Sequence, residues 1–408
     1  MKQWGKRLSI YACALLWGSP FSVVAADGTE GLTQALTGGK ANLDLRLRYE
    51  DVEQDNALED ADALTLRTRL GYTTGKWNDF DMQVEFEDVH ALGDEDYNSC
   101  PGTLSDSCNG NATFSVIADP TDTELNQFWL RYGGIANTVL KYGRQRLILD
   151  NARFIGNVGW RQNEMTYDGF NLVNTSLPKI IVNYSHLTNA NNIFFGDFQL
   201  EGDLLNVAWA PSEQFKLVGY GYLVDFDVNL PARRDTQTLG LRAAGSVPFE
   251  PAKFIYTLEY AKQDDYKDSP STVDADYTLV EAGAVIKPVT AKLGYEVLGG
   301  DGVFGFQTPL ATLHAFQGWA DVFLNTPVVG VQDTYLSLGA VVEKFNFLAV
   351  YHDFSADEGS VDFGTEIDLQ VSRPISDKLN VLAKYADYSA DSFAVDTKKL
   401  WLQAEYKF

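Results

Sequence analysis

Apolar and polar side chains alternate with a period of two through most of the chain. In residues 41–50 the apolar positions are Leu43, Leu45, Leu47 and Tyr49, and the polar positions are Asn42, Asp44, Arg46, Arg48 and Glu50. Successive side chains of a strand point to opposite faces, so this pattern predicts a two-faced β-strand. Similar segments predict eighteen strands, at 41–50, 62–73, 79–92, 124–133, 137–147, 164–175, 179–187, 202–210, 214–226, 235–247, 252–263, 275–287, 289–298, 331–343, 345–354, 361–373, 377–388 and 396–408.

The connections between these segments alternate in length. Short turns are expected at 74–78, 134–136, 176–178, 211–213, 248–251, 288, 344 and 374–376. Long polar connections are expected at 51–61, 93–123, 148–163, 188–201, 227–234, 264–274, 299–330, 355–360 and 389–395. Aromatic residues, among them Trp77, Trp209 and Phe249, gather beside the short turns. Tight turns at one end, long loops at the other and an aromatic girdle are typical of outer-membrane β-barrels.

The last ten residues, 399–408, carry the alternation to the end of the chain. Leu400, Leu402, Ala404, Tyr406 and Phe408 share one face. A strand that closes a barrel in lipid needs such a face, because every backbone polar group in the bilayer must find its partner inside the protein. The terminal Phe408 also resembles the assembly signal that outer-membrane barrels present to the barrel-assembly machinery. The alternative interpretation is the final strand of a soluble β-sandwich.

Residues 1–26 have the layout of a secretory signal peptide. Three basic residues, Lys2, Lys6 and Arg7, precede an apolar stretch at 8–16, and small residues at 24–26 offer a cleavage site. The apolar stretch is too short for a spanning helix. We therefore expect residues 27–408 to form a single domain of the all-β class, a transmembrane antiparallel β-barrel with long extracellular loops and short periplasmic turns, in the outer membrane of a Gram-negative cell.

The composition excludes some functions and indicates one cross-link. The chain has 32 Lys and Arg against 56 Asp and Glu, a formal net charge of −24. Nucleic-acid binding needs basic surface, so it is not expected. Beyond Cys13 of the signal peptide, the chain contains only Cys100 and Cys108, which lie in a turn-rich loop. In an exported protein this spacing favours a local disulfide over a metal site.

If the apolar faces contact lipid, the charged faces line the lumen. The first hairpin and the next strand then present six charged residues to the interior: Arg46, Arg48, Arg67, Arg69, Glu85 and Glu87. Fixed charges in an aqueous channel select among solutes. Alternatively, these charges neutralise one another across neighbouring strands, and both statements can hold together. The faces of Arg144 and Arg146 stay open, because either a bulge intervenes or the strand ends near Gly143.

Several blocks of the chain resemble the alginate-export family of outer-membrane proteins. They are Tyr142-Gly143-Arg144-Gln145-Arg146, Asn151-Ala152-Arg153-Phe154-Ile155-Gly156-Asn157, Trp160-Arg161-Gln162-Asn163-Glu164, Tyr167-Asp168-Gly169-Phe170 and a second hallmark at 308–321. The resemblance implies a single-chain barrel of about eighteen strands and, in the founding members, a cation-lined conduit for an anionic polysaccharide. At matching positions it implies a constriction lined by Arg144, Arg146, Arg153 and Arg161. The acidity of the chain departs from a strongly electropositive conduit and favours solutes other than alginate.

These observations predict a porin that passes small or oligomeric anionic solutes, carboxylate-bearing or sugar-like, by passive diffusion. The alternative is a structural or receptor-type barrel with a loop-occluded lumen, because the connections 93–123 and 299–330 are long enough to fold inward. An enzyme is not expected, since no Gly-x-Ser-x-Gly or His-Glu-x-x-His motif occurs. No cofactor is expected beyond Ca²⁺ held loosely by acidic extracellular loops. The expected partners are outer-membrane lipid, lipopolysaccharide and the solute.

Overall fold

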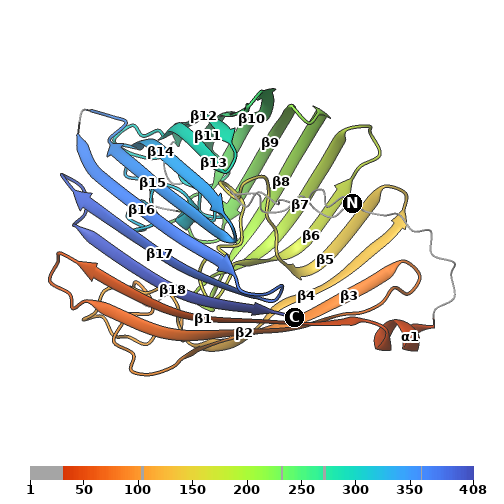
Figure 1. Cartoon of the computed structure of the whole chain (residues 1–408). Helices are drawn as coiled ribbons and strands as arrows, with labels where there is room; N and C mark the ends of the chain where they lie inside the picture. Colours follow the sequence, from red (N-terminus) through yellow and green to blue (C-terminus); the bar gives the residue numbers. More distant parts are fainter. Residues whose placement is uncertain (1–30, 103–104, 231–232, 270–272, 360) are drawn as a thin grey trace, which may run out of the picture.

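The wall of the molecule is one closed antiparallel sheet. The computed structural model describes residues 31–102, 105–230, 233–269, 273–359 and 361–408, so the expected signal peptide, 1–26, lies outside the described residues. Within these ranges eighteen strands form a single sheet, which confirms the predicted barrel. Each strand pairs with its neighbours in the chain, and β1 (Lys40–Gln54) closes the barrel on β18 (Thr397–Lys407). Figure 1 shows the tilted strands side by side around the wall.

The remaining strands follow in chain order around the barrel. They are β2 (Ala61–Thr73), β3 (Phe80–Ala91), β4 (Asp122–Ile135), β5 (Thr138–Gln145), β6 (Thr166–Asn174), β7 (Ile180–Asn191), β8 (Asp197–Ser212), β9 (Phe215–Phe226), β10 (Thr236–Phe249), β11 (Ala252–Asp265), β12 (Asp274–Ile286), β13 (Val289–Leu298), β14 (Val331–Val342), β15 (Phe345–Ser355), β16 (Asp362–Pro374) and β17 (Leu379–Ala390). Each predicted segment overlaps one of these strands.

The two faces of the wall divide as the alternation predicts. The outward positions are large and apolar and remain exposed, as at Leu70, Phe86 and Leu241, whereas the inward positions Arg48 and Glu87 are buried. Aromatic residues at the short-turn ends, including Trp209 and Phe249, are also exposed. An apolar outer band with aromatic ends suits a bilayer, and a polar inner face suits a lumen. By the same rule the short turns lie at the periplasmic end.

The C-terminal strand closes the barrel up to its last residue. The backbone N–H of Leu43 donates to the carbonyl oxygen of Phe408 at 3.0 Å, and the N–H of Phe408 donates to the carbonyl of Leu43 at 2.8 Å. Asp44 lies opposite Lys407 in this pairing. Both edges of the sheet are therefore satisfied within the chain, as a bilayer requires.

In the described part of the chain, two short helices accompany the barrel. Helix α1 (Leu32–Thr37) lies outside the wall, at the end where β1 begins (Figure 1). It is attached by the Tyr72 hydroxyl, which donates to Leu36, and by the Gly75 N–H, which donates to Ala35. The 3₁₀ helix η1 (Leu313–Ala315) lies in a long connection. No helix in the described ranges has the length and apolarity needed to cross a membrane.

Several predicted boundaries were wrong. The connection expected at 51–61 covers only 55–60, because β1 continues to Gln54. The connection expected at 188–201 is short, because β7 continues to Asn191 and β8 begins at Asp197. The segment expected at 137–147 ends at Gln145. Within it Gly143 has φ +119°, and a side chain there would collide with the carbonyl oxygen of Phe128. The strand thus runs past Gly143 and then stops.

Three long connections fold into the barrel. Tyr97 and Ile117 of the connection 92–121 pack on Val52 and Ala61 of the inner wall. The connections 146–165 and 299–330, which we call the first and second inward loops, join each other inside the lumen. The N–H of Gly156 donates to Leu310 at 2.8 Å, and the N–H of Thr312 donates to Ala152 at 3.0 Å. Backbone pairing between loops requires both to be ordered, so they form one internal layer.

The fold predicts a depth-dependent response to charge on the outer face. Leu241 lies outward near the middle of β10, and Val247 lies outward beside a short turn. We expect Leu241→Arg to reduce the free energy of unfolding by about 2–4 kcal/mol, and Val247→Arg by about 0–1 kcal/mol, because a guanidinium costs most at the bilayer centre. Denaturant titration in lipid vesicles measures both. Equal costs at the two positions would contradict the assigned membrane band.

Candidate functional site

The site begins with arginines that the register of the first hairpin brings together. Arg46 of β1 lies opposite Arg67 of β2, and β18 brings Glu405 to the other side of Arg46. Like charges directly opposite destabilise a sheet. Glu405 offsets this repulsion, because one of its oxygens lies 3.0 Å from Arg46 and 3.3 Å from Arg67. Arg67 also contacts Asp44 at 2.7 Å, so the row is paired from within the wall.

Backbone oxygens of the first inward loop accept hydrogen bonds from two arginines of β1, Arg46 and Arg48. Arg46 Nη1 donates to the carbonyls of Gly159 and Trp160, both at 3.1 Å. Arg48 Nη2 donates to Trp160 at 2.6 Å, and the Arg48 guanidinium lies 4.2 Å from the centroid of the Trp160 ring. Hydrogen bonds to a charged donor are among the stronger ones. They hold the loop against the wall of β1.

A second contact ties this loop to the connection 92–121. Arg161 pairs with Glu50 of β1 and with Asp119, whose Oδ2 lies 2.8 Å from Arg161 Nη2. Burial by itself would raise the pKa of Asp119, but the Arg161 and Arg48 guanidiniums outweigh it and hold that pKa below the ordinary 3.8. Asp119 is therefore ionised, and its charge fastens two loops and the wall at one point.

A third contact involves Glu164, at the end of the first inward loop. Its carboxylate pairs with Arg146 and lies 3.5 Å from Arg69 Nη2, while Asn126 donates to it at 2.8 Å. Arg69 in turn pairs with Glu87. Burial would raise the pKa of Glu164, yet the Arg146 and Arg69 charges and the Asn126 hydrogen bond hold it well below its usual range. The carboxylate remains charged and connects both arginines.

The second inward loop is attached on the side of β17 and β18. The Trp160 ring stacks on His314, with centroids 4.6 Å apart and planes 5° apart. Burial lowers the pKa of His314 to about 3, so the imidazole is neutral and Nε2 accepts from Lys384 Nζ at 2.6 Å. His314 Nδ1 bonds Asp321, which also lies 2.9 Å from Lys399. The loop is thus fixed to the wall by neutral and ionic contacts together.

Two of the arginines expected at the constriction lie elsewhere. Arg144 shares the outward face of β5 with exposed Tyr142, lies opposite Phe128 and pairs with Asp168 at 2.9 Å. The strand continues through this position, which places its side chain outside the lumen. Arg153 is inside but distant from the first hairpin, because it binds Glu296 of β13 at 2.7 Å. Arg153 joins the inward loops to the opposite wall.

The other predicted site residues come together. Six arginines, namely Arg46, Arg48, Arg67, Arg69, Arg146 and Arg161, meet seven carboxylates, namely Asp44, Glu50, Glu85, Glu87, Asp119, Glu164 and Glu405. We call these thirteen residues the charge cluster. Six positive and seven negative charges nearly cancel. Most of the cluster therefore fits the alternative that these charges neutralise one another. Arg146 is the most accessible of its arginines, with a third of its side chain exposed.

Sequence reasoning missed several parts of the site. Glu50 was assigned to the inner face by alternation, but its partner Arg161 is 111 residues away and no local pattern connects them. Trp160 and His314 lie inside blocks that were singled out, yet their stacking depends on two loops meeting. The disulfide expected between Cys100 and Cys108, by contrast, is present, within the connection that carries Asp119. The described residues hold no group of three or more His, Cys, Asp or Glu side chains placed to bind a metal ion.

The Asp119 contact predicts how the internal layer responds to pH. A carboxylate with a lowered pKa stabilises the fold above its ordinary value, and this stabilisation is lost as the pH falls. We expect steady single-channel current from pH 8 down to the ordinary pKa of 3.8, and flickering as the pH falls further and Asp119 becomes protonated. Asp119→Asn should flicker at pH 7, because losing one partner of a buried pair costs about 3–5 kcal/mol. Exposed Asp122, bonded to Ser107, supplies the control Asp122→Asn; flicker in that variant alone would contradict the assignment.

The comparisons with known proteins agree with this architecture. The chain matches the family described as alginate export over residues 40–296. It resembles the crystal structure of Acinetobacter baumannii OccAB4, with a TM-score of 0.72 and 14% identity over 91% of this chain and 98% of that chain. For Acinetobacter baumannii OccAB2 the TM-score is 0.72 and the identity 15%, over 93% of this chain and 100% of that chain. For Pseudomonas aeruginosa OpdK, which was solved with vanillate, the TM-score is 0.71 and the identity 14%, over 91% of this chain and 99% of that chain.

At such low identity these structures show the fold alone, an outer-membrane porin-like barrel. No curated protein sequence matches the chain. The family match covers more than half of the chain and includes the first inward loop that holds the charge cluster. The protein therefore belongs to the alginate export family.

Proposed function

We propose that the protein is a passive diffusion channel for small carboxylate-bearing or sugar-like solutes. One observation carries the proposal. Between the charge cluster and the short turns, the inner wall carries half-exposed cations, namely Arg131, Lys141, Lys216 and Lys292, and Arg146 is the most accessible arginine of the charge cluster itself. Inside a barrel a charged side chain stays exposed only where water reaches it. These positions therefore line a solvated path that leads to the charge cluster.

The chemistry of this path suits oxyanions and hydroxyls. Guanidinium groups offer several donors in a fixed plane and bind carboxylates bidentately, whereas lysine is a point charge. At the charge cluster several N–H groups have no hydrogen-bond acceptor in the described chain: Arg48 Nη1, Arg67 Nε, Arg67 Nη1 and Arg69 Nη2. The structural neighbour OpdK was solved with vanillate, a carboxylate, which is compatible with this solute class.

A specific observation favours a second candidate, a structural or receptor-type barrel. Arg48 and Arg67 are fully buried, and the first inward loop covers Arg48 with the carbonyl oxygen of Trp160. If the loops never move, the charge cluster closes the lumen. The two candidates differ in conductance, because a closed barrel passes no solute in any salt.

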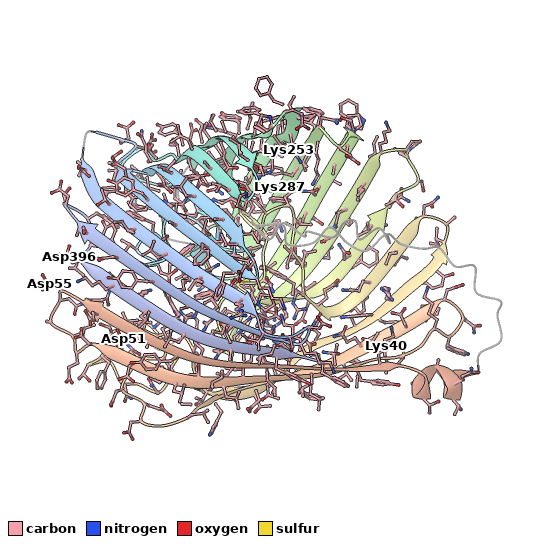
Figure 2. The ribbon with its side chains drawn as sticks, in the orientation of Figure 1. Lys40, Asp51, Asp55, Lys253, Lys287 and Asp396 are labelled. Atoms are coloured by element: carbon pink, nitrogen blue, oxygen red, sulfur yellow. A yellow bond between two sulfur atoms is a disulfide. The ribbon has the colours of Figure 1, made fainter. Side chains whose placement is uncertain are left out.

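The untested expectations about the cell surface also become proposals. Asp51, Asp55 and Asp396 lie at one end of β1 and β18, and Lys40 lies at the other (Figure 2). We propose that carboxylates at this long-loop end hold divalent cations loosely beside lipopolysaccharide phosphates. We further propose that β18, with its terminal Phe408, is the strand that the assembly machinery receives. The short-turn end carries Lys253 and Lys287 instead (Figure 2).

Liposome swelling tests the channel directly. Vesicles that contain the protein should swell in sodium benzoate faster than in a neutral sugar of similar size, because the half-exposed cations attract the carboxylate. Vesicles that swell in neither solute would favour the closed barrel. Equal rates would remove the anion preference but keep the channel.

A matched pair of variants assigns the preference to the lumen. Arg146→Gln should reduce the benzoate rate about fivefold relative to the sugar, since one nearby charge contributes roughly 1 kcal/mol in a solvated site. Arg144→Gln removes the same charge from the outward face and should leave the ratio unchanged. The lumenal assignment fails if both variants change the ratio equally.

A further inference from the structure

Lys141 occupies an unusual place on the inner wall. It lies opposite Arg131 of β4 and Asn171 of β6, on the inward face of β5. The strand begins at Thr138 beside a short turn, so Lys141 is on the periplasmic side of Arg146, in the solvated part of the lumen. A solute that reaches or leaves the charge cluster passes this side chain.

Lys141 differs from its neighbours in having no acidic partner. Arg131 is held by both oxygens of Asp81, and Lys216 lies 3.2 Å from Asp150. Among the described residues, no carboxylate oxygen is within 4.0 Å of the Lys141 ammonium. The ammonium instead lies 4.6 Å from the centroid of the Trp129 ring. A ring face attracts a cation but offers no oxygen to its N–H groups, so their hydrogen-bonding capacity remains unused.

The ring beside it has an unused donor as well. Trp129 is 6% exposed, and its indole Nε1 has no hydrogen-bond partner in the described chain. An indole N–H buried without an acceptor is unsatisfied, and an oxygen atom placed beside it would accept its hydrogen bond. The two unpaired donors, an ammonium and an indole N–H, belong to side chains in direct contact. Both require the same kind of partner, an oxygen atom with negative charge.

The surroundings leave room for a small group. A cavity of about 90 Å³ lies next to Arg131, lined by Lys76, Asp79, Asp81, Arg131, Gly133 and Val139. Val139 precedes Lys141 by two residues, so the two side chains share the inward face of β5. At roughly 30 Å³ per water this space holds about three waters, comparable to a carboxylate group. The cavity therefore lies beside Arg131, which is opposite Lys141 in the sheet, and neither Lys141 nor Trp129 is among its lining residues.

We propose that Lys141 and Trp129 form an oxyanion subsite that binds the carboxylate of a solute on the periplasmic side of the charge cluster. The proposal rests on the proposed channel function and names a specificity-determining pair within it. Lys141 supplies the charge, and the Trp129 N–H supplies a directed hydrogen bond. Arg131, already neutralised by Asp81, limits the subsite on one side.

Block of single-channel chloride current by benzoate tests the subsite. Lys141→Gln should raise the half-blocking benzoate concentration about ten- to a hundredfold, because a hydrogen bond to a charged group contributes about 1.5–3 kcal/mol. Trp129→Phe should raise it about two- to tenfold, as expected for one neutral donor. Lys141→Arg keeps the charge and should retain the block. A heat-modifiable gel shift confirms that each variant is folded.

Arg144→Gln is the matched control, because it removes a cation of the same strand that faces outward and already has a carboxylate partner, Asp168. It should change the half-blocking concentration less than about twofold. Equal effects of Lys141→Gln and Arg144→Gln would overturn the subsite in favour of a general effect of protein charge. A conducting channel that benzoate does not block, or blocks equally without Lys141, also overturns it while the proposed channel function stands. A folded protein that carries no current contradicts the channel function and the subsite together.

Discussion

The structure depends on the need of the buried charges on the inner wall to find partners inside the barrel. A buried ion without a partner is strongly destabilising, and the wall alone does not satisfy its arginines. Arg161 of the first inward loop and Asp119 of the connection 92–121 meet Glu50 and Arg48, while Glu164 joins Arg69 to Arg146. The loops are therefore held by the same charges that they neutralise. Wall and loops stabilise each other.

The contacts between wall and loops also determine which cations are exposed along the lumen. Where the loops contact the wall, the arginines are buried and close to neutral as a group. Nearer the short turns, cations such as Arg131 and Lys216 are half-exposed, and Lys141 has no acidic partner. Selectivity in such a lumen depends on local geometry more than on net charge. A chain with a formal net charge of −24 can consequently present cations to a solute.

Much of the fold follows from local pattern. The alternation of Leu45 and Leu47 with Arg46 and Arg48 predicts the strand and both of its faces, because the period of a strand is two and lipid allows only apolar side chains outside. The same rule could not assign Arg144 and Arg146, since the strand ends between them and alternation then stops. The conformation of Gly143 and the end of β5 at Gln145 determine where the side chains of Arg144 and Arg146 lie.

The contacts inside the barrel could not be predicted in this way. The partner of Arg153 is Glu296, 143 residues away, and the stacking of Trp160 on His314 requires two loops to meet. Such pairs leave no periodic signal in one sequence. The resemblance to alginate-export proteins correctly marked the segments, but it assigned Arg144 and Arg153 to a common constriction that the structure separates.

The reversal potential of the unmodified protein tests the central claim most directly. In a planar bilayer with a potassium chloride gradient, half-exposed lumenal cations should make chloride the more permeant ion, and the sign of the potential reports this. The account predicts small, steady channels whose reversal potential is shifted toward the equilibrium potential of chloride. A reversal potential shifted toward the equilibrium potential of potassium, or a folded barrel without current, would contradict it.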